Sequence, residues 1–316
     1  MKLIRGLNQL SSKLNGCVMT SGNFDGVHLG HQAVIQQVKD LADEKNVSSL
    51  VMFFEPQPLE FFAPEKAPKR LYRLREKIIA MQQLGIDYLF CVPFNHNFSQ
   101  LTGEQFVIDY LHNALNVKHL VVGDDFCFGK NRSGTFDLLV QLSAQYGFTV
   151  QNTSTIQQQN ERVSSTKIRQ LIAANQFDEV SKLLGHPYSL SGKVSHGKKL
   201  GRVIGFPTIN VKMGEIPVAV EGIFAVRVKG LDNGGSEASI NGVASIGTRP
   251  TVKGVGVLLE VYLLDFNQDV YGKTVAVEFL KQIRTEEDFI SIDVLIEHIK
   301  QDVKIAQEFF NNNPLS

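Results

Sequence analysis

Hydrophobic residues in the first half of the chain follow two alternating patterns. Compact apolar runs, of which residues 17–19 are the first, are typical of buried strands. The apolar residues that come next recur at helical spacing: Val34, Ile35, Val38, Leu41 and Ala42. On this basis we predict strands at residues 17–19, 48–54, 87–92, 118–122 and 149–152, and helices at residues 31–45, 71–84, 102–115, 136–146 and 163–174. This alternation predicts a doubly wound, mostly parallel α/β sheet.

The alternation stops near residues 185–187, a Gly-His-Pro run. Strand-like segments then follow one another with Gly, Pro and Asn between them, at residues 188–194, 204–211, 223–228, 239–245, 257–264 and 274–283. One long helix, at about residues 292–310, closes the chain. Many short strands without intervening helices predict a closed, Greek-key-like antiparallel barrel. We therefore expect two domains, residues 1–185 and residues 186–316.

Composition narrows the class of protein. A chain of 316 residues favours two domains over one, and no apolar run approaches the roughly 18 residues that a membrane span needs. Lys+Arg and Asp+Glu balance at 32 each, which argues against a nucleic-acid partner. Polar residues follow the first five, and the three cysteines include no Cys-x-x-Cys pair. We expect a cytoplasmic protein with reduced thiols and no membrane partner. The composition is compatible with a monomer and with a weak homo-oligomer.

The turn between the first predicted strand and the first predicted helix is rich in glycine and histidine. Gly22, Gly26 and Gly30 let the backbone approach a ligand closely, and the N-terminus of the helix attracts anions. His28 and His31 are three residues apart, so both can point at one phosphate and stabilise the charge that develops on it. The alternative is a glycine-rich turn with two surface histidines.

Two further strand ends carry candidate site residues. The second strand ends in Phe54, and Pro56 and Pro58 follow it, where the prolines stop strand pairing and predict an extended loop. Phe62 on this loop is able to cover a flat ring, although plain packing under the loop explains it as well. A second loop bounded by glycines, residues 123–129, follows the fourth strand.

Hydroxyl groups and cations also gather where the helix at 163–174 begins. Ser164, Ser165 and Thr166 are either ordinary helix caps or, together with Arg169, a second anion site for a triphosphate.

The second domain contains a separate candidate site. Thr208 and Asn210 alternate along a predicted strand and therefore share a face, where their oxygen atoms suit Mg²⁺. A polar outer face of the strand is the alternative. Glu260 lies in an otherwise apolar strand, so it is either a surface residue or a base that faces a pocket.

Several of these runs resemble known enzyme families. The His28-Leu29-Gly30-His31 run resembles the signature of the HxGH nucleotidylyltransferases, and residues 22–31 resemble the version in bacterial bifunctional riboflavin kinase/FAD synthetases. Residues 164–169 are similar to the Ser-Ser-Thr-x-Ile-Arg run of the same transferases. Residues 201–210 resemble the Gly-x-x-x-Gly-Phe-Pro-Thr-x-Asn motif of riboflavin kinases. Gln57 stands where the bifunctional riboflavin kinase/FAD synthetases usually have His. Ile209 stands where the riboflavin kinase motif often has Ala.

The resemblance implies two reactions. The C-terminal domain would phosphorylate riboflavin with ATP to give FMN, with Glu260 as the base and Mg²⁺ and ATP held by Gly205, Pro207, Thr208 and Asn210. The N-terminal domain would transfer AMP from ATP to FMN, giving FAD and pyrophosphate, with His28 and His31 as catalytic residues. Its ATP phosphates would be bound by Gly22, Asn23, Phe24, Asp25, Gly30, Ser164, Ser165, Thr166 and Arg169. Its flavin would contact Phe54, Pro56, Phe62 and Asp125.

Two other interpretations remain open at this point. A transferase of the same superfamily with another phosphate or alcohol substrate explains His28 and His31 but leaves Glu260 without a role. A non-catalytic flavin-binding protein would bind flavin tightly and turn over no ATP. Flavin fluorescence with and without Mg-ATP distinguishes the three.

Overall fold

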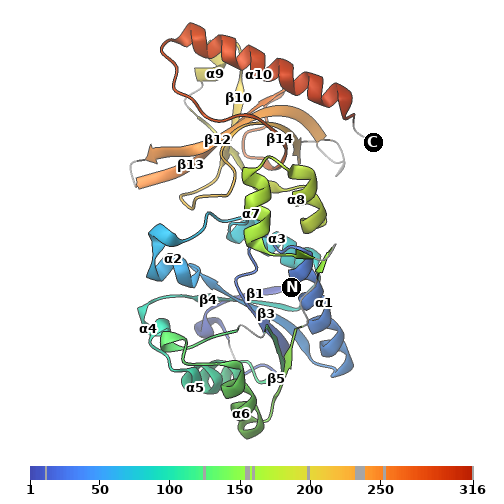
Figure 1. Cartoon of the computed structure of the whole chain (residues 1–316), viewed down its shortest axis with the longest axis vertical. Coiled ribbons are helices and arrows are strands. Elements are labelled where there is room, and N and C mark those ends of the chain that lie inside the picture. The colour runs from blue at the N-terminus through green and yellow to red at the C-terminus, as the bar shows by residue number, and fades with distance from the viewer. Residues whose placement is uncertain are drawn as a thin grey trace. The chain divides into compact units, whose positions relative to one another are not determined.

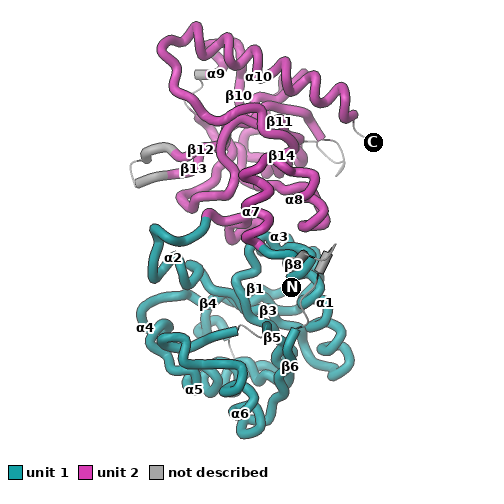
Figure 2. The backbone as a smooth tube through the Cα atoms, in the orientation of Figure 1, with its two compact units in different colours: residues 1–68, 77–164 teal, residues 69–76, 165–316 magenta. Residues whose placement is uncertain are grey.

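The computed structural model describes residues 1–10, 13–123, 126–153, 157–158, 161–197, 200–231, 239–251 and 254–314. The chain forms two compact units (Figure 2): residues 1–68 with 77–164, and residues 69–76 with 165–316. Residues 165–184 thus pack with the second unit, whereas the sequence predicts a domain boundary near 186. Which residues each activity requires stays a prediction.

The first unit is built on a six-stranded sheet in which all pairs are parallel and the order is β1-β4-β3-β2-β5-β6 (Figure 1). Its strands are β1 (Lys2–Arg5), β2 (Cys17–Ser21), β3 (Ser48–Glu55), β4 (Tyr88–Pro93), β5 (Val117–Val122) and β6 (Thr149–Asn152). A two-stranded ribbon joins β7 (Gln157–Gln158) to β8 (Glu161–Arg162). The parallel α/β sheet that the sequence predicts is confirmed.

Helices connect these strands. They are α1 (Leu29–Glu44), α2 (Pro58–Phe62), α3 (Leu74–Gln83), α4 (His96–Ser99), α5 (Gly103–Phe106), the π-helical segment Val107–Ala114 and α6 (Phe136–Tyr146). Single 3₁₀ turns lie at Leu7–Gln9, Pro64–Lys66 and Lys130–Arg132.

The sheet of the first unit is buried on both faces because its central strands are apolar at successive positions. Met19 of β2 packs with Leu50 and Leu120 in one cluster. Val18, one position earlier, packs on the other face against Val38 of α1. Residues one apart on a strand point to opposite faces, so both layers of helices have an apolar surface to cover.

The second unit is a closed barrel with the strand order β10-β13-β12-β11-β14-β9, and all its pairs are antiparallel. The strands are β9 (Ser189–Ser195), β10 (Thr208–Lys212), β11 (Gly222–Lys229), β12 (Ser239–Thr251), β13 (Gly254–Leu263) and β14 (Thr274–Arg284). Its helices are α7 (Ser165–Ala173), α8 (Phe177–Leu184), α9 (Leu200–Val203) and α10 (Ile292–Asn312). The predicted barrel and C-terminal helix are confirmed.

Helix α10 lies across the outside of the barrel (Figure 1). Ser291 caps its first turn, since the Ser291 hydroxyl accepts a hydrogen bond from the Val294 N–H at 3.3 Å. Ala306 and Phe310 on its apolar face pack with Ile223 of β11 and Val243 of β12. The burial of this face holds the helix on the barrel.

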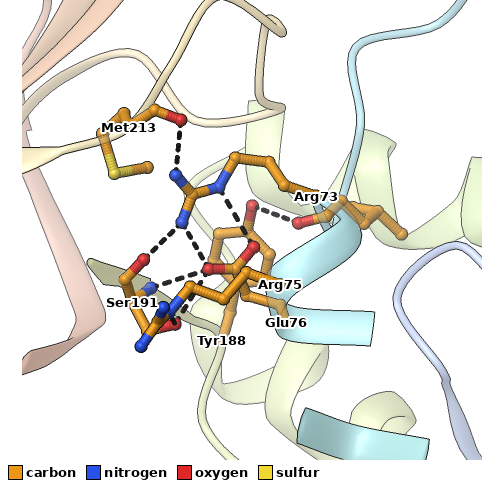
Figure 3. A network of polar contacts seen from close by, with 7 residues as sticks. Arg73, Arg75, Glu76, Tyr188, Ser191 and Met213 are labelled. Carbon is orange, nitrogen blue, oxygen red and sulfur yellow. Dashed lines mark hydrogen bonds and ion pairs between the residues drawn. The ribbon is translucent and has the colours of Figure 1, made fainter. Parts of the chain in front are cut away.

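Residues 69–76, here called the strap, come from the first half of the sequence and pack in the second unit. Figure 3 shows their polar contacts. The Arg73 guanidinium donates to the Met213 carbonyl at 2.6 Å and pairs with Glu76. The Glu76 carboxylate also accepts the Ser191 N–H at 2.9 Å, and the Tyr188 hydroxyl donates to the Leu71 carbonyl at 2.9 Å. Arg73 and Glu76 are both buried, so these bonds satisfy charges that water does not reach.

The structure corrects several predicted elements. Residues 17–19 belong to the second strand, because the short edge strand β1 precedes them. Pro58 begins helix α2, where a proline is tolerated in the first turn, so the predicted extended loop is shorter. Helices α8 and α9 were not predicted, and the strand predicted to start at 204 begins at Thr208.

Candidate functional site

The glycine- and histidine-rich turn follows β2, which lies between β3 and β5 in the sheet. The chain leaves β2 in one direction, toward β3 and β4, and returns to its other side at β5. Ligands of open α/β sheets bind beyond the carboxyl ends of strands at such a reversal point. The turn at residues 22–28 therefore occupies the position where a ligand site is expected.

The backbone of this turn is unusual. Phe24 has a φ of 46° and Val27 a φ of 41°, values in the left-handed region that residues with side chains rarely adopt. Both side chains are buried, and so is that of Asp25. The Gly22 N–H donates to the Met52 carbonyl on β3 at 3.1 Å. Strained backbone held by surrounding contacts is typical of ligand sites.

His28 and His31 lie together at the N-terminus of α1. His28 is the N-cap residue, and its Nδ1 accepts a hydrogen bond from the His31 N–H at 3.3 Å. A neutral His28 that accepts at Nδ1 carries its proton on Nε2, where it can donate to a ligand. The two rings stack with 3.6 Å between their centroids. The structure thus brings both predicted histidines to one place.

The pKa of His31 lies well below its ordinary value of 6.5. Burial is the largest cause, because it disfavours the charged form, and the neighbouring His28 and Lys77 lower the pKa further. His31 is therefore a neutral imidazole near pH 7.

Gly30 is required by the close packing of this turn. A Cβ atom at position 30 would lie 3.2 Å from ring atoms of His28 and 3.6 Å from the Val163 carbonyl oxygen. The chain next to Ser164 therefore approaches the turn. Ser165, Thr166 and Arg169 lie in α7 of the second unit, where Arg169 donates to the Lys69 carbonyl at 2.7 Å.

Three buried side-chain atoms of the first unit have no hydrogen-bond partner among the described residues. They are Ser21 Oγ, His31 Nδ1 and Gln57 Nε2. Ser21 ends β2, His31 follows the turn after it, and Gln57 follows β3, so all three come from the carboxyl-end side of adjacent strands. Buried polar groups normally have partners, and a bound ligand would supply them here. Sequence reasoning gave Gln57 no role and did not mark Ser21.

An aromatic cluster lies on the same unit. A cavity of about 300 Å³ is lined by Phe62, Phe94, Phe98, Phe106 and Arg132, among others. The predicted flavin residue Phe54 packs against Phe94 and Phe98, with ring centroids 5.8 and 5.5 Å apart. The peptide bond between Glu55 and Pro56 is cis. Asp125 lies outside the described residues.

Sequence reasoning missed most of this cavity. Phe94 follows β4 directly, Phe98 lies in α4 and Phe106 in α5. The signal that could have found them was the concentration of phenylalanine in this segment. Phe62 is the most exposed of the lining aromatics, at 63%. An exposed ring beside an aromatic cavity is suited to stacking on a planar ligand.

The barrel unit has a larger cavity of about 1180 Å³. Its walls include residues of β10 and β13 on one side and of α10 on the other. Thr208, Asn210 and Glu260 all line it. In the antiparallel pairing of β10 with β13, Asn210 stands directly opposite Glu260, and Thr208 stands opposite Tyr262. Side chains in such pairs lie on one face and within contact distance.

The neighbours of Glu260 explain its orientation. Leu259 and Val261 are fully buried on the opposite face of β13. Ser195 of β9 pairs with Asn210, and Ser245 of β12 pairs with Glu260, so polar side chains surround the carboxylate on the cavity face. Sequence reasoning did not identify either serine as a site residue.

The loop before Thr208 is shaped by glycine and proline. Gly205 has a φ of 89°, which a residue with a Cβ adopts only with strain. The Phe206 N–H donates to the Gly201 carbonyl at 2.8 Å, and the Phe206 ring packs edge-on against Tyr262. Gly201 and Phe206 line the cavity, whereas Gly205 and Pro207 shape the turn beside it.

Helix α10 supplies the other wall through Leu295, Ile299 and Val303. Arg284, at the end of β14, donates to both carboxylate oxygens of Asp302 on this helix, at 2.8–3.2 Å. The Arg284 guanidinium also lies 5.3 Å from the centroid of the Phe289 ring. A bidentate pair of this kind sets the distance and orientation of the two elements it joins. Nothing in the sequence reasoning identified it.

Comparisons with known proteins match a different family model to each half of the chain. The family model for FAD synthetase matches residues 10–167, and the model for riboflavin kinase matches residues 184–310. The bifunctional riboflavin kinase/FMN adenylyltransferase of Escherichia coli K12 is 48% identical over 311 residues, which is 98% of each chain. That of Haemophilus influenzae is 43% identical over 312 residues, 99% of this chain and all of the relative. The chain belongs to the bifunctional riboflavin kinase/FMN adenylyltransferase family.

Members of this family carry the transferase in the N-terminal half and the kinase in the C-terminal half, the order predicted from the sequence. A solved structure titled as a macrolide-efflux protein from Streptococcus pneumoniae is 29% identical, covers 97% of this chain and gives a TM-score of 0.74. Among the described residues, no helix is long and apolar enough to cross a membrane.

Proposed function

We propose that Glu260 is the general base of riboflavin phosphorylation in the barrel unit. Its carboxylate would accept the proton of the ribityl 5′-hydroxyl while that oxygen attacks the γ-phosphorus of ATP and ADP leaves. The observation that carries this proposal is the pairing of Glu260 with Asn210 on the wall of the 1180 Å³ cavity.

The donor set next to this base suits Mg²⁺. Thr208 and Asn210 present a hydroxyl and an amide oxygen to the cavity from alternate positions of one strand. Such hard oxygen atoms fit a magnesium ion that takes its other ligands from water and phosphate. When bound, the ion would neutralise charge on the phosphates, and Thr208 and Asn210 would orient the nucleotide toward Glu260.

The apolar wall of the same cavity suits the flavin ring. Leu295, Ile299 and Val303 of α10 would contact it, and the Arg284–Asp302 pair would hold the helix in place.

The second reaction belongs to the N-terminal part of the chain, where the FAD synthetase model matches. Residues Gly22, Asn23, Phe24, Asp25 and Gly30 would bind the ATP phosphates at the N-terminus of α1, and Ser164, Ser165, Thr166 and Arg169 would hold the triphosphate tail. A phosphate oxygen of FMN would attack the α-phosphorus and pyrophosphate would leave. His28 and His31 would stabilise the charge that develops in this step.

The flavin of the second reaction would stack on the aromatic cavity beside Phe62. Phe54 supports this wall, and Pro56 shapes the loop that leads to it. The buried Gln57 amide would donate to the ligand. The free thiols of Cys17, Cys91 and Cys127 fit a reducing compartment, and we place both reactions in the cytoplasm.

A two-substrate assay tests these roles. The full chain is given ATP and Mg²⁺ with riboflavin or with FMN, and the flavins are separated by chromatography. Variants Glu260→Gln and His31→Ala should each lose one reaction and keep the other. If either variant loses both reactions or neither, the corresponding assignment is wrong.

A further inference from the structure

Lys77 on α3 is a completely buried lysine next to the phosphate turn. Its side chain has no exposed surface. Its Nζ donates to the Asn23 carbonyl oxygen at 2.7 Å and lies 4.7 Å from the centroid of the Phe53 ring. An ammonium group is costly to bury, so a lysine in this place indicates a need for charge.

The contact with Asn23 is made where the turn is strained. The Asn23 carbonyl belongs to the peptide that leads into Phe24, the residue with a φ of 46°. A hydrogen bond from a charged donor is about twice as strong as a neutral one. Lys77 therefore helps to hold a conformation that the turn would not adopt alone.

Lys77 also acts on the imidazole of His31. Its charge is one of the causes, after burial and His28, that lower the pKa of His31. The ionisable groups to consider around the ring are His28, which stacks on it, Lys77 on α3, and Asp25, buried in the same turn.

We propose that Lys77 is a positioning residue for adenylyl transfer, which holds the phosphate turn through Asn23 and places a positive charge beside it. The proposal rests on the proposed role of His31. With Lys77 in place, a positive charge lies at the turn, and burial, His28 and Lys77 together keep the His31 ring neutral. Negative phosphates that enter the site then meet a turn already in its binding shape, so little reorganisation accompanies binding.

The main test compares Lys77→Met with Lys77→Arg in the full chain. Lys77→Met removes the charge and the donor, and kcat/KM for ATP in FAD synthesis should fall by about 10²-fold, the size expected from a misplaced reacting group. Lys77→Arg keeps the charge and should restore a large part of this loss. Riboflavin phosphorylation, measured on the same samples, should not change.

A second readout is the titration of His31 in protein with labelled histidine, followed by NMR without substrate. Removal of a neighbouring positive charge favours the imidazolium, so the pKa of His31 should rise in Lys77→Met and stay low in Lys77→Arg. The control is Lys39→Met, because Lys39 also donates to a main-chain carbonyl, that of Leu84, at 2.7 Å. This variant should change neither the pKa of His31 nor the rate of FAD synthesis.

Each outcome is informative. Wild-type FAD synthesis in Lys77→Met overturns the proposal, and so does an unchanged His31 titration in that variant. If Lys77→Met does not fold, Lys77→Arg decides: a titration of His31 near its ordinary pKa would contradict the charge role. His31→Ala is measured in parallel. Normal FAD synthesis in His31→Ala would refute the role of His31 itself, whereas an inactive His31→Ala beside an active Lys77→Met refutes only the role of Lys77.

Discussion

Asn210 and Glu260 face each other across the β10–β13 pair, with both side chains on the wall of one cavity. The pairing places a neutral amide, rather than a cation, opposite the carboxylate on this strand. A general base must lie within hydrogen-bond reach of the hydroxyl that it deprotonates, and the place of Glu260 on the cavity wall gives a bound substrate this access.

Glu260→Gln should therefore lower kcat for FMN formation by about 10²–10⁴-fold, the usual effect of losing a general base. Glutamine keeps the size and hydrogen bonding of the side chain, so riboflavin binding should change little. FAD synthesis from added FMN serves as the control on the same sample. Near-normal kinase turnover would leave the barrel without an identified base.

Replacement of either turn histidine should abolish FAD synthesis and spare the kinase. His28→Ala removes the N-cap as well as a donor, whereas His31→Ala removes only a ring. Loss of one preorganised donor costs about 3–4 kcal/mol of transition-state stabilisation. The rate of pyrophosphate release from FMN and ATP measures it, and an unchanged rate in His31→Ala would contradict the assignment.

The Arg284–Asp302 pair should control the flavin wall of the kinase cavity. Asp302→Asn keeps the shape of the side chain but removes the charge that the bidentate guanidinium contacts. Helix α10 should then hold its position less firmly, and KM for riboflavin should rise more than kcat falls. Steady-state kinetics measure this split, with FAD synthesis as the control. A fall in kcat alone would exclude a role in flavin binding.

The strap should be required for the stability of the second unit. Arg73→Met leaves the buried Glu76 carboxylate without its cation, and loss of one partner of a buried pair costs about 3–5 kcal/mol. The free energy of unfolding, measured in urea through loss of kinase activity, should fall by this amount. Lys182→Met, which breaks the exposed pair with Glu179, is the matched control and should change little.

A double variant makes this test sharper. Arg73→Met with Glu76→Met removes both charges, so it should be less destabilised than the sum of the single variants. A fragment of residues 184–316 contains the predicted domain 186–316, which we expect to fold and phosphorylate riboflavin by itself. The fragment lacks the strap and also α7 and nearly all of α8, which belong to the second unit. We expect it to be active but less stable than the full chain. An insoluble fragment, or a soluble but inactive one, would contradict the predicted boundary or show that the domains depend on each other.

The fold was predictable where local patterns decide it. Alternation of apolar strands with amphipathic helices specified the parallel sheet, and short strands separated by turn residues specified the barrel. The prediction missed elements with weak local patterns. Strand β1 has four residues, and α8, with its apolar residues Phe177, Val180 and Leu184, lies in a segment for which no element was predicted.

The site was predictable where its residues are close in sequence. His28 and His31 share a turn, and Thr208 and Asn210 share a strand. Contacts between distant segments leave no such pattern. Lys77 reaches Asn23 across 54 positions, Arg284 meets Asp302 through the packing of α10, and the aromatic cavity combines rings from several short elements. Only the folded chain brings these groups together.

The strap also sets an order of events during synthesis. Met213, whose carbonyl accepts the Arg73 guanidinium, is translated 140 residues after Arg73. At about 5–20 residues per second the ribosome needs roughly 7–28 s to cover that distance. During this interval Arg73 has been synthesised and its partner Met213 has not. All strands of the first sheet, the last of which ends at Asn152, are therefore synthesised before the barrel segments that the strap contacts.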